Sequence, residues 1–316
     1  MVYRRFGKLE WQVSAIGMGT WNIGNQWGEI DDATAFATIQ EALDQGVNLF
    51  DTAEAYGVPS GLSEERLGRA LLGRRHQVHI VSKIGHWGRR TGAQVPITGV
   101  DAVRLCMHAI LYRLRTDYVD VVLCHKGDIE DPSVFLEAFE LLKQRGHLRA
   151  YGISSNDIEV VKRFNAHGTC SVVELEYSLL NREAEAELLP YCEEHGIAVL
   201  VRGPLRKGLL SGRYDPTATF TDSVRSRWYA TEKGRRNLER DLANVARLSE
   251  HLAPGAEMVR AALRFALSHP AHPVAIPGAK SPAQMAMNAS AGDRVLTANE
   301  RHNLVKWLDG GTDPTA

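Results

Sequence analysis

The sequence predicts an α/β protein built as one (β/α)8 TIM barrel. Short apolar runs alternate with amphipathic helical patterns along the chain, and each pair forms one βα unit. Eight such units fit in 316 residues, which lies within the usual size range of this barrel. No linker-like change of composition divides the chain, so residues 1–316 are expected to form a single domain.

The predicted strands are short apolar runs. The opening segment fits a short N-terminal hairpin that precedes the first core strand. Successive core strands are expected to be parallel, because each is separated from the next by at least one helical pattern. They are predicted over residues 13–18, 47–50, 78–82, 118–124, 149–153, 171–175, 197–201 and 273–276.

Helices are predicted between these strands from apolar residues spaced three to four apart. Asp31 and Ser63 stand where helix caps are expected, and Gly46 and Gly73 stand where helices end. The polar, Arg-rich residues 212–235 predict a long loop on the active-site side. The helices are expected over residues 32–45, 63–72, 101–115, 132–145, 157–166, 183–195, 238–252 and 256–268, with one more from 281 and a C-terminal extra helix from 297.

Composition excludes several classes of partner. Lys and Arg number 37 against 38 Asp and Glu, so charge gives no reason to expect nucleic acid or an anionic membrane. The four cysteines form no CxxC pair and the histidines lack ligand spacing, so neither a disulfide framework nor a metal is expected. No signal-peptide core or membrane span is present. We expect a cytoplasmic protein with a small-molecule substrate, and the sequence leaves its oligomeric state open.

Polar side chains follow three successive predicted strands. Asp51 begins the stretch DTAEAYG, which also contains Tyr56, while Lys83 and His125 come after the next two strands. Taken alone, Asp51 could cap a turn and Tyr56 could simply pack. However, the carboxyl ends of parallel strands meet at one mouth of a barrel, so these four side chains are expected to come together.

This combination of side chains suits the reduction of a carbonyl group. An ammonium beside a phenol stabilises the phenolate, and a carboxylate keeps the lysine charged, so Tyr56 can donate a proton to a developing alkoxide. The imidazole of His125 can orient the carbonyl oxygen. No nucleophile is obvious, so the hydride must come from elsewhere.

Eight motifs in order make the chain resemble the aldo-keto reductase superfamily over nearly its whole length. The resemblance implies that Tyr56 is the proton donor, that Lys83 and Asp51 tune it, and that His125 positions the substrate oxygen. It also implies a nicotinamide cofactor, usually NADPH, bound across the mouth without a Rossmann glycine fingerprint. The motifs are GMGTW (17–21), DTAEAYG (51–57), SKIG (82–85), the strand ending in His125, GISSN (152–156), ELEYSLLNR (174–182), RGPLRKGLLSG (202–212) and IPGAKSPAQMAMN (276–288).

The resemblance also implies which residues contact the cofactor. Ser154 and Ser155 would hold the nicotinamide carboxamide, and Glu174, where the family usually has glutamine, could accept a hydrogen bond from the amide. Arg202 would stack on the nicotinamide ring, or alternatively pair with a surface carboxylate. The other implied contacts are Gly19, Thr20, Trp21 and Asp51, then Gly203, Leu205 and Lys207 at the pyrophosphate, and Gly278, Lys280, Ser281, Gln284 and Asn288 at the adenosine end.

The resemblance to this superfamily also implies a cofactor preference and a substrate pocket. Lys280 is the candidate for a 2′-phosphate contact, which favours NADPH. Gln284 stands where the family carries arginine, which weakens that preference and leaves NADH open. Trp21 and Trp87, together with Tyr56 and His125, are expected to wall the substrate pocket.

The sequence is compatible with two functional classes. The first is an NADPH-dependent oxidoreductase that reduces aldehydes or ketones to alcohols. The alternative is an NADPH-binding regulatory or redox-sensing protein with incidental turnover, which potassium-channel beta subunits of the superfamily suggest. Retention of all four catalytic side chains favours the enzyme. A cofactor-free hydrolase or isomerase would need a metal site or a carboxylate pair, and the sequence offers neither.

Overall fold

Eight parallel strands form a closed barrel in the described part of the chain, which confirms the predicted fold. The computed structural model describes residues 1–87, 92, 95–215 and 217–309. Strands pair in chain order, and bridges from Ile16 to Ala275 and from Gly19 to Gly278 join the first strand to the last. The strands are β3 (Met18–Gly19), β4 (Leu49–Asp51), β5 (His79–Ile84), β6 (Val119–Cys124), β7 (Leu148–Ser154), β8 (Val172–Glu176), β9 (Ala198–Arg202) and β10 (Val274–Ala275).

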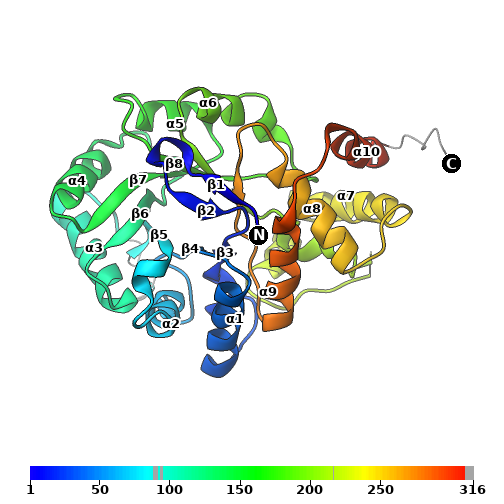
Figure 1. Cartoon of the computed structure of the whole chain (residues 1–316), viewed down its shortest axis with the longest axis horizontal. Helices are drawn as coiled ribbons and strands as arrows, with labels where there is room; N and C mark the ends of the chain where they lie inside the picture. Colours follow the sequence, from blue (N-terminus) through cyan, green and yellow to red (C-terminus); the bar gives the residue numbers. More distant parts are fainter. Residues whose placement is uncertain (88–91, 93–94, 216, 310–316) are drawn as a thin grey trace.

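Helices surround the strands and bury an apolar stripe against them. Two of them, α7 and α8, lie between β9 and β10 in the chain, and α10 is the predicted C-terminal addition (Figure 1). The helices are α1 (Asp32–Asp44), α2 (Leu62–Ala70), α3 (Val100–Leu114), α4 (Ser133–Gln144), α5 (Ile158–Phe164), α6 (Leu188–Glu194), α7 (Glu232–Ser249), α8 (Ala256–Leu267), α9 (Pro282–Ala289) and α10 (Ala298–Leu308).

The predicted first strand over residues 13–18 is wrong in its extent. The run divides between two elements, because Val13 pairs with Arg4 in an antiparallel hairpin of β1 (Tyr3–Arg5) and β2 (Gln12–Ser14). Only Met18 and Gly19 form the barrel strand β3. The predicted N-terminal hairpin itself is confirmed, but it takes the first half of the apolar run.

Three helix predictions also need correction. Gly61 is the cap of α2, and the Ser63 hydroxyl instead donates to the carbonyl oxygen of Thr20 at 2.8 Å. The segment 183–195 is not one helix but a 3-10 turn followed by α6. Helix α7 begins within the predicted loop, because the Thr231 side chain accepts a hydrogen bond from the amide of Gly234 and caps it.

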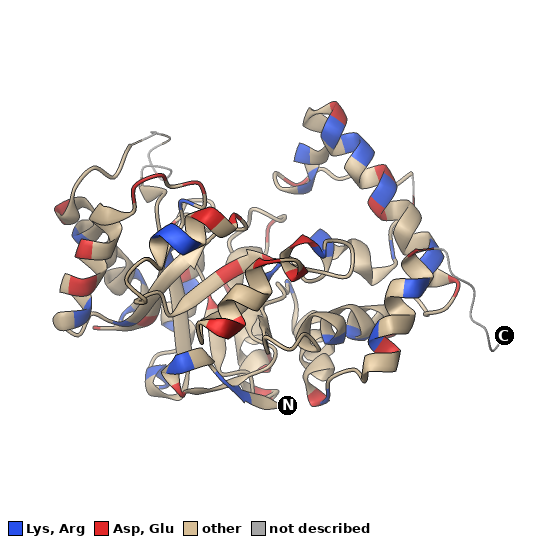
Figure 2. Ribbon diagram, turned by 90° about the horizontal axis from the view of Figure 1, so that it is seen from above, with Lys and Arg blue, Asp and Glu red and all other residues tan. Residues whose placement is uncertain are grey.

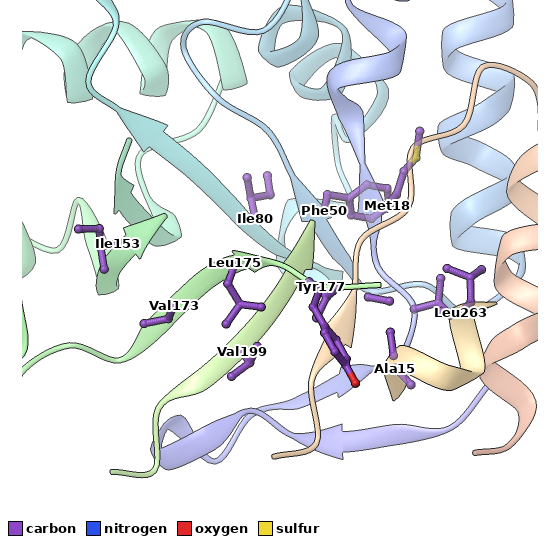
Figure 3. Packing of buried hydrophobic residues seen from close by; sticks show 14 of the residues in the cluster. Ala15, Met18, Phe50, Ile80, Ile153, Val173, Leu175, Tyr177, Val199 and Leu263 are labelled. Carbon is purple, nitrogen blue, oxygen red and sulfur yellow. The ribbon is translucent and has the colours of Figure 1, made fainter. Parts of the chain in front are cut away.

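Two apolar layers follow from the alternation of side chains along the strands. Residues such as Phe50 and Ile80 face the helices, and Figure 3 shows part of this outer layer. Their neighbours Leu49 and Val81 belong to a second cluster inside the barrel. Because side chains alternate with a period of two, a residue two positions after an inward-facing one also points inward.

The hairpin closes the amino-terminal end of the barrel. Phe6 and Val13 belong to the inner cluster, and the amide of Lys8 donates to the carbonyl oxygen of Gly196, just before β9, at 2.8 Å. The hairpin therefore leaves the carboxyl ends of the strands as the open mouth of the barrel.

Charged residues of both signs are interspersed along the outer helices (Figure 2). This distribution accompanies a formal net charge of -1. None of the described helices combines the length and the apolar character that crossing a membrane requires.

Candidate active site

The alternation of side chains brings the predicted polar residues to the inner side of the mouth. Asp51 lies two positions after the inward-facing Leu49 on β4, and Lys83 lies two positions after Val81 on β5. Lys83 is thus inside a strand and not beyond its end. The same rule gives the inward-facing positions at the ends of the next four strands. These are His125 just after β6, Ser154 on β7, Glu174 on β8 and Arg202 on β9.

Lys83 is the centre of a buried charge cluster. Its side chain is completely buried, and its ammonium pairs with Asp51, lies 3.1 Å from Glu174 Oε2 and donates to the carbonyl oxygen of Thr52 at 3.0 Å. The carboxylates are nearly as buried, at 3% exposure for Asp51 and 1% for Glu174. One ammonium therefore pairs with two carboxylates inside the barrel mouth.

Tyr56 lies against this cluster, in the turn that follows β4. The Lys83 ammonium lies 4.9 Å from the centre of the Tyr56 ring. Trp21 stacks on the ring at 5.5 Å, and the His125 imidazole meets it edge-on with 6.0 Å between ring centres. The structure therefore brings together the four residues predicted to be catalytic, although they come from three strand ends and a turn.

Burial is the main factor that keeps the Tyr56 hydroxyl protonated. Burial raises the pKa of the phenol, the carboxylates of Asp51 and Glu174 raise it further, and only Lys83 lowers it. Burial opposes the charge of Lys83, but Asp51 and Glu174 outweigh it and raise the pKa of the lysine. Burial, followed by the charge of Glu174, raises the pKa of Asp51. A protonated phenol is thus available near neutral pH as a proton donor.

A pocket of about 380 Å³ opens beside Tyr56 and is lined by loops that follow β3, β9 and β10. It contains many of the residues predicted to hold a cofactor or substrate. These are Gly19, Trp21, Asp51, Tyr56, Arg202, Gly203, Leu205, Lys207, Gly278, Lys280, Gln284 and Asn288.

Other predicted contact residues do not line this pocket, and each is held by a neighbour. Thr20 Oγ1 donates inward to the carbonyl oxygen of Asp51 at 2.8 Å, and Ser155 Oγ donates to that of Gly127 at 2.6 Å. Ser281 caps α9 by accepting from the amide of Gln284 at 3.3 Å. The remaining ones are Lys83, His125, Ser154, Glu174 and Trp87.

Trp87 lines a separate cavity of about 260 Å³ with Glu54, Cys106 and Arg113. Its indole donates to the carbonyl oxygen of Val95 at 3.0 Å. The structure thus puts Trp87 on a different cavity from Trp21. That Trp21 and Trp87 both wall the substrate pocket stays a prediction.

Arg202 pairs with a carboxylate in this structure, and its stacking on a nicotinamide ring stays a prediction. Its guanidinium pairs with Glu176 at 3.3 Å and donates to Asn156 Oδ1 at 2.8 Å, while it still borders the pocket. Arg206 also pairs with Glu176 and, at 2.7 Å, with Asp241. This network holds the loop after β9 in shape, including the left-handed backbone of Arg206 and Lys207 at φ +47° and +56°.

Several residues that line the pocket were not predicted from the sequence. Asn22 follows β3, while Arg213 and Arg225 come from residues 212–235, which were predicted as a long loop on the active-site side. The arginine content of that stretch is the signal that could have identified them. Ser223 Oγ donates to the carbonyl oxygen of Gln26 at 2.9 Å, which joins this stretch to the loop after β3 at the rim of the pocket.

The pocket suits a dinucleotide. Its lining includes Lys207, Arg213, Arg225 and Lys280, whose positive charges fit phosphate groups. A Cβ at Gly278 would lie 1.7 Å from Asn22 Oδ1, so any larger residue would require the Asn22 side chain to move. Lys280 is partly engaged, because its ammonium donates to the carbonyl oxygen of Trp27 at 2.8 Å. Among the described residues no group of three or more His, Cys, Asp or Glu side chains could hold a metal ion.

Comparison with known proteins identifies relatives along the whole chain. A model of the Aldo/keto reductase family matches residues 15–308. The aldo-keto reductase YhdN of Bacillus subtilis (strain 168) is 32% identical over 98% of this chain and 94% of its own. An NADH-specific methylglyoxal reductase of Escherichia coli (strain K12) is 34% identical over 65% of this chain and 68% of its own. The structure of an aldo-keto reductase from Klebsiella pneumoniae in complex with NADPH superposes with a TM-score of 0.71 at 28% identity, covering 100% of this chain and 98% of that one.

Proposed function

The chain belongs to the aldo/keto reductase family, and on this premise we propose that it reduces aldehyde or ketone carbonyls to alcohols with NADPH, using Tyr56 as proton donor. Membership of the family makes it an oxidoreductase that acts on small carbonyl compounds. The single observation that carries the finer proposal is the packing of Tyr56 between Trp21, His125 and the Lys83 ammonium on the wall of the pocket.

Each side chain of the cluster has one task in this reaction. His125 orients the carbonyl oxygen toward the phenol of Tyr56, which donates its proton as negative charge develops on that oxygen. Lys83 stabilises the phenolate that remains, and Asp51 holds the lysine charged and in place. The nicotinamide cofactor, when bound, supplies the hydride.

The pocket beside Tyr56 is the proposed cofactor site. Lys207, Arg213 and Arg225 would bind phosphate groups, and Lys280 would contact a 2′-phosphate with the protons that its bond to Trp27 leaves free. The NADPH-bound structural neighbour supports NADPH, whereas the NADH-specific relative supports NADH as the alternative. Ser154, Ser155 and Glu174 are retained as proposed contacts to the nicotinamide carboxamide.

Arg202 keeps its proposed place beside the nicotinamide ring as a residue of the pocket border, anchored by Glu176. We also propose that residues 1–316 act as one domain around the barrel. A cytoplasmic location and the class of carbonyl substrate stay predictions.

Replacement of Tyr56 by phenylalanine tests the proposal. The change removes the transferable proton and keeps the ring that stacks on Trp21, so turnover of aldehydes should fall by at least ~10²-fold. Dinucleotide affinity, measured by fluorescence titration with NADPH and NADH, should stay close to that of the unmodified protein. Normal turnover of a clean aldehyde by this variant would refute the role of Tyr56.

A further inference from the structure

Glu174 adds a second carboxylate to the buried cluster around Lys83. Asp51 and Glu174 both pair with the ammonium of Lys83, and both carboxylates are shielded from water. A lysine with one carboxylate partner would form a neutral pair beside Tyr56. With two partners the cluster carries one negative charge when all three groups are ionised.

The position of Glu174 is fixed by the barrel. It lies on β8 and points inward, with Oε2 at 3.1 Å from Lys83 Nζ. Its other oxygen, Oε1, accepts a hydrogen bond from Ser154 Oγ on β7 at 3.2 Å. Oε1 is thus hydrogen-bonded, whereas Oε2 lies beside the ammonium without a hydrogen bond to any described residue, so charge attraction holds the carboxylate against the lysine.

We propose that Glu174 is a positioning residue that acts on Tyr56 through Lys83. Its carboxylate offsets part of the ammonium charge and keeps the phenol protonated, which favours carbonyl reduction over alcohol oxidation. This inference rests on the proposed function of the site.

The preference for reduction follows from the protonation state of Tyr56 that each direction of the reaction requires. In reduction the O–H bond of Tyr56 breaks and its proton joins the carbonyl oxygen, the carbonyl carbon receives hydride from the reduced nicotinamide, and Tyr56 becomes phenolate. In alcohol oxidation the phenolate must take the proton from the alcohol, whose carbon gives up hydride to the oxidised nicotinamide. The charged or titratable groups that face Tyr56 are Asp51 from β4, Lys83 from β5, His125 after β6 and Glu174 from β8, and burial and the two carboxylates raise the pKa of the phenol.

The direct test is the ionisation of Tyr56 in the protein without cofactor. Phenolate absorbance would be followed across alkaline pH in the unmodified protein and in Glu174→Gln, and the signal of a matching Tyr56→Phe variant would be subtracted from each. Glutamine keeps the shape of the side chain and removes its charge. We expect Tyr56 to ionise at least about one pH unit lower in Glu174→Gln, and an unchanged titration would overturn the inference.

Two variants separate the effect of charge from that of packing. Glu64 is a matched control, since it is also fully buried, pairs with Arg113 at 2.6 Å and accepts from Ser82 Oγ at 2.6 Å. Glu64→Gln should leave the Tyr56 titration in place. Glu174→Asp retains the charge and should titrate close to the unmodified protein. A shift in Glu64→Gln equal to that in Glu174→Gln, or a full shift in Glu174→Asp, would overturn the proposed role of the charge.

Turnover in both directions gives a second readout. At saturating cofactor, kcat for alcohol oxidation at neutral pH should rise in Glu174→Gln, by at most about tenfold for each pH unit by which Tyr56 becomes more acidic, because the phenolate also becomes a weaker base. Reduction should begin to decline at a lower pH than before. An equal fall in kcat for reduction and for oxidation would instead indicate that the substitution disturbs the structure of the site, and it would overturn the inference. Absence of turnover in every protein would contradict the proposed function, and the phenolate titration would still decide the role of Glu174.

Discussion

Replacing Lys83 by methionine should destabilise the fold by about 3–5 kcal/mol at pH 8, because it breaks a buried ion pair by removing one partner. Methionine nearly matches the length of the lysine side chain but carries no charge. Asp51 and Glu174 would then be buried without their cation, and the carbonyl oxygen of Thr52 would lose its donor at 3.0 Å. The site is fully buried, so water cannot replace the ammonium without rearrangement.

The loss should grow with pH. Burial and the charge of Glu174 already raise the pKa of Asp51, and removal of the ammonium raises it further. A carboxyl group whose pKa is higher in the folded than in the unfolded protein contributes stability below its unfolded pKa, and that contribution is lost as pH rises through the folded pKa. The variant should therefore lose stability above about pH 5, by at most ~1.4 kcal/mol per pH unit for each such group.

Urea unfolding at pH 5.5 and pH 8 measures this effect. Lys162→Met is the control, because Lys162 pairs with Glu159 at 2.8 Å on the exposed surface and its loss should cost no more than about 0.5 kcal/mol. The double variant Asp51→Asn, Lys83→Met removes one stranded carboxylate and should recover part of the stability at pH 8. Stability of Lys83→Met that matches the unmodified protein at both pH values, or a double variant no more stable than the single one, would refute the reasoning.

Three further changes probe the cofactor pocket and the barrel. Lys280→Ala should weaken NADPH about ten- to a hundredfold in calorimetric titration and spare NADH, whereas equal loss for both would show that the 2′-phosphate is bound elsewhere. Ser223→Ala removes the 2.9 Å bond to Gln26 and should speed dinucleotide release about two- to tenfold in stopped-flow fluorescence, and an unchanged rate would contradict a restraining role for this bond. Gly152→Ala would put a Cβ 1.7 Å from the carbonyl oxygen of Val172, so it should cost about 1–3 kcal/mol, and an unchanged Tm would show that the strands separate easily.

The sequence predicted the fold and the central side chains because both follow from regular periods. Apolar runs located the strands, and their period of two also determines which residues point inward. Asp51 and Lys83 each continue the inward-facing set that begins with Leu49 and Val81. The same alternation, applied further along the chain, brings Glu174 to Lys83, a contact that the sequence reading did not propose.

The loops were predicted less well because no period governs their side chains. Trp87 follows the same strand as Lys83 but lies on a different cavity, and Thr20 turns inward to Asp51. Asn22 and Arg225 reach the pocket from loops whose course depends on distant contacts, such as the bond between Ser223 and Gln26. Most of the remaining pocket residues were predicted from the family motifs. Such motifs indicate which sequence positions contact a cofactor, but they do not indicate the conformation of the loops.

The join between the first and last strands links cofactor binding to the stability of the barrel. Strands β3 and β10 are each two residues long, whereas β6 spans six and β7 seven. Gly19 and Gly278 form a bridge across this join, and both also line the pocket. A ligand that contacts both sides would stabilise this short join, because its free energy of binding opposes separation of the two strands. Without it, local opening should start at this join, where exchange of the amide hydrogens of Gly17 and Ala275 with solvent would record it.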